Sequence, residues 1–226
     1  MIITSIFLIF ISVVIYILFY YLKKQLKWDI LNPLLCSIAG TILFLRFLNF
    51  DYVAYNYLGQ YAHYILTATV TCLALPLYKQ VSLLKKNLKP ILIGITTGVF
   101  TNILSIWFIY FIFNLNREQL VTLMPKSITT GLGADISANL GGIVPITIAI
   151  IVATGLVGAL SAPFILKLFK IDNSVAKGVA IGTASHLAGT TKAMEMGETE
   201  GAISSLSLVI CGIMTVTLLS IMFLIF

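Results

Sequence analysis

Long stretches without a charged side chain constrain this chain more than any other feature of its sequence. The first covers residues 2–22, twenty-one residues that include no Asp, Glu, Lys or Arg. A helix of roughly 20 apolar residues crosses the hydrocarbon core of a bilayer. Across the sequence 59% of the residues are hydrophobic and 10% are charged, whereas a soluble domain carries about 25% charged residues. The sequence therefore predicts an all-α protein that crosses a membrane several times.

Six segments have the length and hydropathy of full transmembrane helices. They are residues 2–22, 31–49, 59–78, 90–113, 143–167 and 201–225. A cleaved secretory signal begins with basic residues, but here Lys23 and Lys24 follow the first apolar run, so we expect that run to be retained as a helix. We expect a single integrated membrane domain with three parts: an N-terminal helix and basic linker, a first half and a second half, residues 1–30, 31–116 and 117–226.

Ten lysines that follow predicted helices indicate the orientation of the chain. They are Lys23, Lys24, Lys27, Lys79, Lys85, Lys86, Lys89, Lys167, Lys170 and Lys177. Because lysines concentrate in cytoplasmic loops, we expect these ten in the cytoplasm and the amino terminus outside. The net charge of +6 then reflects membrane topology, and no nucleic-acid partner is predicted. For all ten to share one side, residues 120–141 must enter the membrane and return. A simple crossing of this segment is the alternative.

Two segments of membrane length, residues 120–141 and 175–198, carry an unusual share of polar residues and helix breakers. The first includes "MPKSITTGLGADISANLG", and the second includes "GTASHLAGTTKAMEMGE". Broken backbone at membrane depth is tolerated only where protein buries it or where it lines a cavity. Many transporters place two such broken helices at the membrane midplane, where half-helix N-termini face an anionic substrate. We therefore expect two broken or re-entrant segments that meet in one site, with an inverted repeat as a possible origin.

Hydroxyl and cationic side chains in these two segments are the candidates for binding a small organic anion. The predicted substrate-binding residues are Ser127, Thr129, Thr130, Ser137, Thr183, Ser185, His186, Thr190 and Lys192. His186 is also a candidate for proton coupling because its unperturbed pKa of about 6.5 suits that task. Its alternative is a hydrogen-bonded structural residue.

The remaining charges of these segments have open alternatives too. Asp135 and Glu195 are predicted as proton-coupling or structural charges, because ionisable residues are costly in lipid and face a cavity or mark a segment end. Lys192 lies three residues before Glu195, so an ion pair within the helix is its alternative. Lys126 is a second candidate cation, and its alternative is to reach the membrane interface.

Signatures of catalysis and metal binding are absent from the sequence. It contains no HExxH, Walker loop or GxSxG motif, which are the usual marks of metalloproteases, nucleotide hydrolases and serine hydrolases. The cysteines Cys36, Cys72 and Cys211 are far apart and lie in apolar stretches. We expect no enzyme activity, no cofactor and no metal ion.

Several stretches resemble the LrgB/CidB family of bacterial membrane proteins, which has relatives in plant plastids. They are "MPKSITT" at Met124, "DISANLGG" at Asp135 and "GTASHLAGTTKAMEMGETEGAISSL" at Gly182, and the resemblance covers about residues 32–226. It implies either of two functions. One is an antiholin-like regulator of murein hydrolase activity and autolysis that works with a small holin-like LrgA/CidA partner. The other is a carrier, since plastid relatives are described as glycolate/glycerate carriers and bacterial relatives are linked to pyruvate.

The residues and the resemblance together predict a secondary carrier of small monocarboxylates that works by alternating access. The antiholin-like regulator is kept as the alternative. The expected partners are a small organic anion, the lipid bilayer, a second copy of the chain in a homodimer, and a small holin-like membrane protein.

Overall fold

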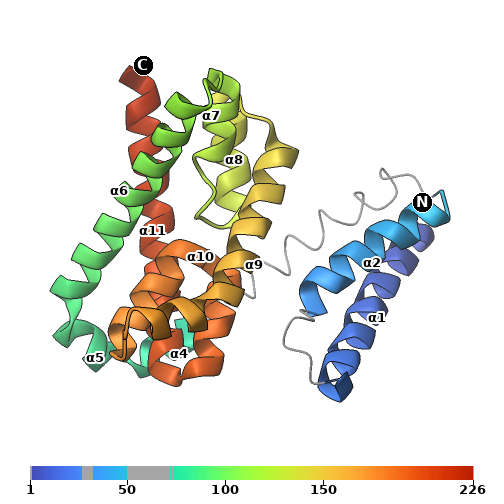
Figure 1. Ribbon diagram of the computed structural model, residues 1–226, viewed down its shortest axis with the longest axis horizontal. Helices are drawn as coiled ribbons and strands as arrows, with labels where there is room; N and C mark the ends of the chain where they lie inside the picture. The colour runs from blue at the N-terminus through green and yellow to red at the C-terminus, as the bar shows by residue number, and fades with distance from the viewer. Residues whose placement is uncertain (1, 27–32, 50–71, 73, 226) are drawn as a thin grey trace. The chain divides into compact units, whose positions relative to one another are not determined.

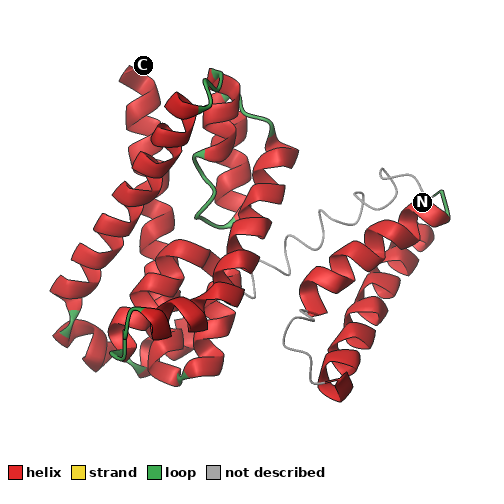
Figure 2. Ribbon diagram, viewed as in Figure 1, coloured by secondary structure: helices red, strands yellow, loops and turns green. Residues whose placement is uncertain are grey.

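The computed structural model describes residues 2–26, 33–49, 72 and 74–225, and every regular element in them is a helix (Figures 1 and 2). The chain forms two compact units, Met1–Cys72 and Leu73–Phe226. We call them unit 1 and unit 2. Each is described by itself.

Unit 1 contains α1 (Ile2–Leu26) and α2 (Pro33–Phe47). The two helices pack closely at Gly40 of α2, which lies against the side chains of Ile15 and Phe19 on α1. α1 is long and apolar enough to cross a membrane, whereas α2 is a shorter apolar helix of 15 residues. At 1.5 Å per residue α2 extends only about 22 Å, less than the roughly 30 Å of a hydrocarbon core. It is therefore shorter than the predicted span 31–49, and most of the predicted span 59–78 lies outside the described residues.

Unit 2 is built on three long helices, α6 (Leu88–Ile112), α9 (Val144–Leu168) and α11 (Glu198–Ile225), preceded by the short α4 (Ala74–Lys79) and α5 (Val81–Lys86). With α1, these three make four helices in the described residues that are long and apolar enough to cross a membrane. The three correspond to the predicted spans 90–113, 143–167 and 201–225. The protein is thus a multi-pass helical membrane protein.

The three long helices of unit 2 define two ends. At one end Lys79 of α4 lies 3.9 Å from Glu198, where α11 begins. At the other end the Arg117 guanidinium lies 5.8 Å from the centre of the Phe223 ring near the end of α11. α6 begins soon after α4 at the first end and finishes shortly before Arg117 at the second. It therefore runs in the same direction as α11. We call them the lysine-rich end and the Arg117 end.

The first polar segment forms a helical hairpin that opens toward the Arg117 end. It consists of α7 (Arg117–Leu123), a turn at residues 124–129, and α8 (Thr130–Leu140). The backbone N–H of Ile143 donates to Thr122 Oγ1 at 2.9 Å, and Thr147 Oγ1 donates to the Thr122 carbonyl at 3.0 Å. The end of α7 therefore lies beside the start of α9. We call residues 117–143 the first hairpin and residues 124–129 its tip.

The second polar segment, α10 (Ser174–Met196), is broken at His186, whose φ of 37° and ψ of −129° are not helical. A Cβ on Gly189 would lie 3.1 Å from the Ile181 carbonyl oxygen, although residues eight apart in a straight helix are separated by about 12 Å. Gly182 packs against Ser204 before the break, and Thr190 Oγ1 lies 2.9 Å from Ser204 Oγ after it. The two arms thus return along α11 to the same end.

This second hairpin, residues 174–197, opens toward the lysine-rich end. Its first arm begins beside the start of α6, where Val179 fills the space above Gly94. Its tip, residues 183–186, packs on the middle of α9. α9 begins beside Thr122 of the first hairpin and therefore runs from the Arg117 end to the lysine-rich end. Figure 1 shows α7 and α8 in the half of unit 2 near the C-terminus and α10 in the opposite half. The two polar segments enter unit 2 from opposite ends.

Candidate functional site

The tips of the two hairpins meet between α9 and α11. The Cys211 sulfur of α11 lies 3.9 Å from the Ser127 carbonyl oxygen and 3.7 Å from the Thr183 carbonyl oxygen. On α9, the Ile151 carbonyl contacts His186 Nε2 at 2.8 Å, and the Ile151 side chain fills the space beside Gly133 of the first hairpin. Polar residues about 55 positions apart in the sequence are therefore brought to one place.

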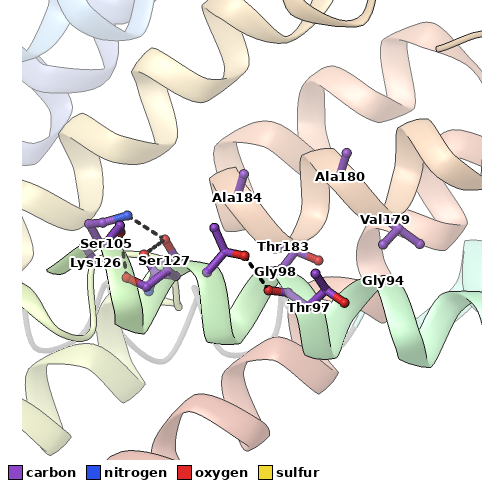
Figure 3. Close-up of a pocket in the computed structure, with 12 residues that line it drawn as sticks. Gly94, Thr97, Gly98, Ser105, Lys126, Ser127, Val179, Ala180, Thr183 and Ala184 are labelled. Atoms are coloured by element: carbon purple, nitrogen blue, oxygen red, sulfur yellow. Dashed lines mark hydrogen bonds between the residues drawn. The ribbon is translucent and has the colours of Figure 1, made fainter. Parts of the chain in front are cut away.

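A pocket of about 440 Å³ lies between α6 and the first arm of the second hairpin (Figure 3). We call it the α6 pocket. Lys126 and Ser127 from the first tip lie at one end of it, Gly94 and Val179 at the other, and Thr183 between them. It is also lined by Thr97, Gly98, Thr101, Asn102, Ser105, Ala180 and Ala184.

The contribution of α6 was missed by the sequence analysis. Its lining residues Gly94, Thr97, Gly98, Thr101, Asn102 and Ser105 repeat every three or four positions and so share one helix face. From the sequence, the Gly94 and Gly98 pair indicates close helix packing. The structure confirms the packing, since Gly98 lies against the Thr183 methyl group: a Cβ on Gly98 would lie 2.5 Å from that methyl carbon. The repeat of small and hydroxyl residues was the available signal.

Lys126 brings an ammonium group to the pocket without a carboxylate partner. Its Nζ lies 3.4 Å from Ser127 Oγ, which in turn donates to Asn102 Oδ1 at 3.1 Å. The ion pairs found among the described residues are Lys79–Glu198 and Lys192–Glu195, and neither includes Lys126. A cation held among neutral polar groups is complementary to an anion.

Thr183 brings a hydroxyl group without a hydrogen bond. The residue is 6% exposed, and its Oγ1 is the one buried side-chain nitrogen or oxygen in the described part of the chain that has no partner. An unsatisfied buried hydroxyl costs about 1–3 kcal/mol. A ligand in the α6 pocket would satisfy it.

His186 holds the second tip in place. Because the Ile151 carbonyl can only accept, the bond at 2.8 Å requires a proton on Nε2. The ring occupies the space left by Gly155, where a Cβ would lie 2.5 Å from Cε1. A positive φ in a residue other than glycine costs on the order of 1–3 kcal/mol and persists only where the surroundings enforce it. The structure thus gives His186 a structural contact, and its coupling role stays a prediction.

The other predicted site residues lie in different surroundings. Ser185 is at the second tip. Thr129 is the N-cap residue of α8 and Thr130 is its first residue, and the Thr129 side chain makes no capping hydrogen bond. Ser137 Oγ is bonded to Thr147 Oγ1 at 2.7 Å, and Thr190 Oγ1 donates to the His186 carbonyl at 2.8 Å.

The predicted charged residues other than Lys126 lie away from the α6 pocket. Lys192 pairs with Glu195 at 2.7 Å, and Asp135 is exposed on α8. No group of three His, Cys, Asp or Glu among the residues that the structure describes could hold a metal ion. The structure therefore brings Ser127 and Thr183 together with Lys126 in the α6 pocket, and leaves the other predicted residues, Ser185 at the second tip included, outside it.

Two opposed polar hairpins inside a frame of apolar helices define a multi-pass membrane protein with polar side chains in its interior. A family model described as the LrgB-like family matches residues 12–225, so the chain belongs to this family. The resemblance stated from the sequence motifs is thereby confirmed.

Individual relatives match over almost the whole chain. Holin-like protein CidB of Staphylococcus aureus (strain Mu50) is 34% identical over 222 residues, covering 98% of this chain and 97% of CidB. Holin-like protein CidB of Staphylococcus epidermidis (strain RP62A) is 34% identical over 93% of each chain. Uncharacterized protein YxaC of Bacillus subtilis (strain 168) is 32% identical over 93% of this chain and 91% of YxaC. None of these names describes a catalytic activity, and no solved structure matches the chain.

Proposed function

We propose that this protein is a secondary carrier that binds a small monocarboxylate, such as pyruvate or glycolate, in the α6 pocket. The observation that carries the proposal is the pairing of an ammonium group without a carboxylate, on Lys126, with a buried hydroxyl without a hydrogen bond, on Thr183. Both side chains line the same pocket.

The pocket favours a small anion of single charge. One ammonium group balances one carboxylate, and the amide group of Asn102 adds donors beside it, because only its oxygen is engaged by Ser127. A volume of about 440 Å³ is near the lower end of the roughly 300–1,000 Å³ of small-molecule sites. Ser127, Thr183 and Lys126 would bind the carboxylate, and the hydroxyls of α6 would surround the rest of the molecule.

The opposed hairpins support alternating access as the mechanism. In a bilayer crossed by α6, α9 and α11, each hairpin would re-enter from one face and place its tip near the midplane. Cys211, which contacts both tips, is close to the middle of α11. Carriers with broken helices bind their substrate at this depth and move one part of the fold against another around it.

Orientation, proton coupling and assembly form part of the same proposal. The lysine-rich end would face the cytoplasm by the positive-inside rule, with the amino terminus outside. His186, Asp135 and Glu195 remain the candidates for proton coupling. In a homodimer, the second copy of the chain would anchor the half of the protein that stays in place while the other half moves.

The antiholin-like regulator of autolysis remains a second candidate because the relatives from Staphylococcus aureus and Staphylococcus epidermidis are named holin-like protein CidB. In this function the chain would assemble with a small holin-like LrgA/CidA partner and would move no solute by itself. Substitutions on packing faces such as that of Gly94 and Gly98 would then matter more than those at the hairpin tips.

Uptake into liposomes tests the two candidates against each other. Radiolabelled pyruvate, glycolate and lactate would be offered to liposomes that contain this chain alone, with and without a pH gradient, and protein-free liposomes serve as the control. Saturable uptake supports the carrier, and dependence on the gradient adds proton coupling. Uptake that requires the small partner makes this chain one part of a transporter, and no uptake in either case favours the regulator.

A further inference from the structure

Lys126 lines a second pocket as well as the α6 pocket. This second pocket has a volume of about 410 Å³ and lies between α9 and the tips of both hairpins. We call it the α9 pocket. It is lined by Lys126, Ala153, Thr154, Val157, Gly158, Ala184 and Ser185. Lys126 and Ala184 are shared by the two pockets.

Each pocket also contains a hydroxyl that takes part in none of the side-chain hydrogen bonds found in the described residues. In the α6 pocket it belongs to Thr183, as described above. In the α9 pocket it belongs to Ser185, which is 2% exposed and takes part in none of the side-chain hydrogen bonds found in the described residues. Two pockets with matching chemistry therefore flank one helical arm.

The helical geometry of the arm explains why the two hydroxyls serve different pockets. Successive residues of an α-helix are rotated by about 100°, so Thr183 and Ser185 point to nearly opposite sides of the arm. On one side the Thr183 methyl group packs on Gly98 of α6. On the other side Ser185 Oγ occupies the place where a Cβ of Gly158 on α9 would lie. A glycine on each neighbouring helix lets that helix approach the arm.

We propose that the α9 pocket is a second subsite for the same carboxylate, which passes from Thr183 to Ser185 while Lys126 accompanies it. This inference rests on the carrier function proposed above. The ammonium of Lys126 is carried on a flexible four-carbon stem with three donors, so it can keep its charge beside the anion in either pocket. The anion then crosses the second tip without leaving its counter-charge.

Filling each pocket separately tests the proposal. Thr97 lines only the α6 pocket and Ala153 lines only the α9 pocket, and both side chains are exposed. Thr97→Phe therefore adds bulk to the α6 pocket alone, and Ala153→Phe adds bulk to the α9 pocket alone, without disturbing the core. Ile148→Phe is the matched control, since Ile148 is an exposed residue of α9 outside both pockets.

Two measurements on the purified full-length chain separate the outcomes. Equilibrium binding of radiolabelled pyruvate and glycolate reports on the α6 pocket, and their exchange across liposome membranes reports on passage. Ala153→Phe is expected to bind within twofold of the unsubstituted protein and to exchange at least tenfold more slowly. Thr97→Phe is expected to weaken binding at least tenfold, and Ile148→Phe to change neither quantity.

Exchange by Ala153→Phe within twofold of the unsubstituted rate would refute the second subsite and leave the carrier function standing. Ser185→Ala is a second, smaller change, which is expected to slow exchange several-fold with binding unchanged, and an unchanged rate would count against the subsite equally. If the unsubstituted protein neither binds nor exchanges these anions, the carrier function itself fails, and the subsite fails with it.

Discussion

The two hairpins of unit 2 are both rich in hydroxyl groups, but they use them differently. In the first hairpin the hydroxyl of Thr122 bonds to the backbone, and that of Ser137 bonds to Thr147 at the start of α9. In the second hairpin Thr183 and Ser185 lie near the tip and bond to nothing. Polarity in a membrane segment therefore does not by itself mark a binding site. The informative groups are those that folding leaves unsatisfied.

A glycine substitution in the second hairpin should have the largest effect. A Cβ on Gly182 would contact the Ser204 carbonyl oxygen and lie 2.9 Å from Ser204 Cα. Because this neighbour is backbone, the arm must move away from α11, and we expect Gly182→Ala to cost about 3 kcal/mol. Heating followed by size-exclusion chromatography would show less folded protein at every temperature.

The matched control for that change is Gly212→Ala on α11. There a Cβ would approach only the flexible Leu132 side chain, at 3.2 Å. Its melting profile should stay close to that of the unsubstituted protein. Equal losses from both substitutions would contradict the close packing of the second hairpin on α11.

The lysines of the two hairpins offer the next comparison. Lys126 faces both pockets without an ion pair, whereas Lys192 is paired with Glu195. Removal of a charged hydrogen-bond partner costs up to about 3 kcal/mol, so Lys126→Met should weaken anion binding about 100-fold. Lys192→Met should change it less than about threefold. Equilibrium binding of labelled pyruvate and glycolate to the purified variants measures both effects. A larger loss of binding with Lys192→Met would place the site on the second arm of the second hairpin.

Thr183→Val separates the binding role of the second hairpin from its stability. The change removes a hydroxyl that has no partner in the structure, so the melting temperature should stay the same or rise. Binding of the anion should weaken about tenfold, the equivalent of one hydrogen bond to a charged group. A drop in stability with unchanged binding would show that the hydroxyl is structural.

The same substitution at Thr147 of α9, which bonds to the first hairpin, should give the reverse result, and the smallest effect. Thr147→Val removes the donor to the Thr122 carbonyl and the partner of Ser137. We expect a loss of about 1 kcal/mol in stability and binding within twofold of the unsubstituted protein. Weaker binding without a loss of stability would mean that the closed network of the first hairpin also serves the site.

Much of this fold follows from the sequence because hydropathy is a local property. The ends of α6, α9 and α11 lie within about three residues of the predicted spans. The breaks in the two polar segments also follow from local signals, which are the glycines, Pro125 and the polar residues around His186. α2 is the exception, since its described helix is shorter than the predicted span.

The site was harder to predict because hydrogen-bond partners are distant in sequence. Nothing in the residues around Ser137 shows that Thr147 will satisfy it, and nothing around Thr183 shows that its hydroxyl will stay free. The surroundings of Lys126 are hidden in the sequence for the same reason, whereas the Lys192–Glu195 spacing already indicates the ion pair that the structure shows. Predicting the site requires the packing of α6 and α10, which only the folded chain provides.

The hairpins also constrain how the protein is synthesised. Each takes hydrogen-bond partners from a helix that the ribosome produces later: Thr122 and Ser137 from Thr147 of α9, and Thr190 from Ser204 of α11. A newly made hairpin is therefore a polar segment that lipid cannot accept. Until α9 or α11 arrives, it must remain in the aqueous channel of the translocation machinery. The order of helices along the chain thus sets the order in which the interior can be released into the bilayer.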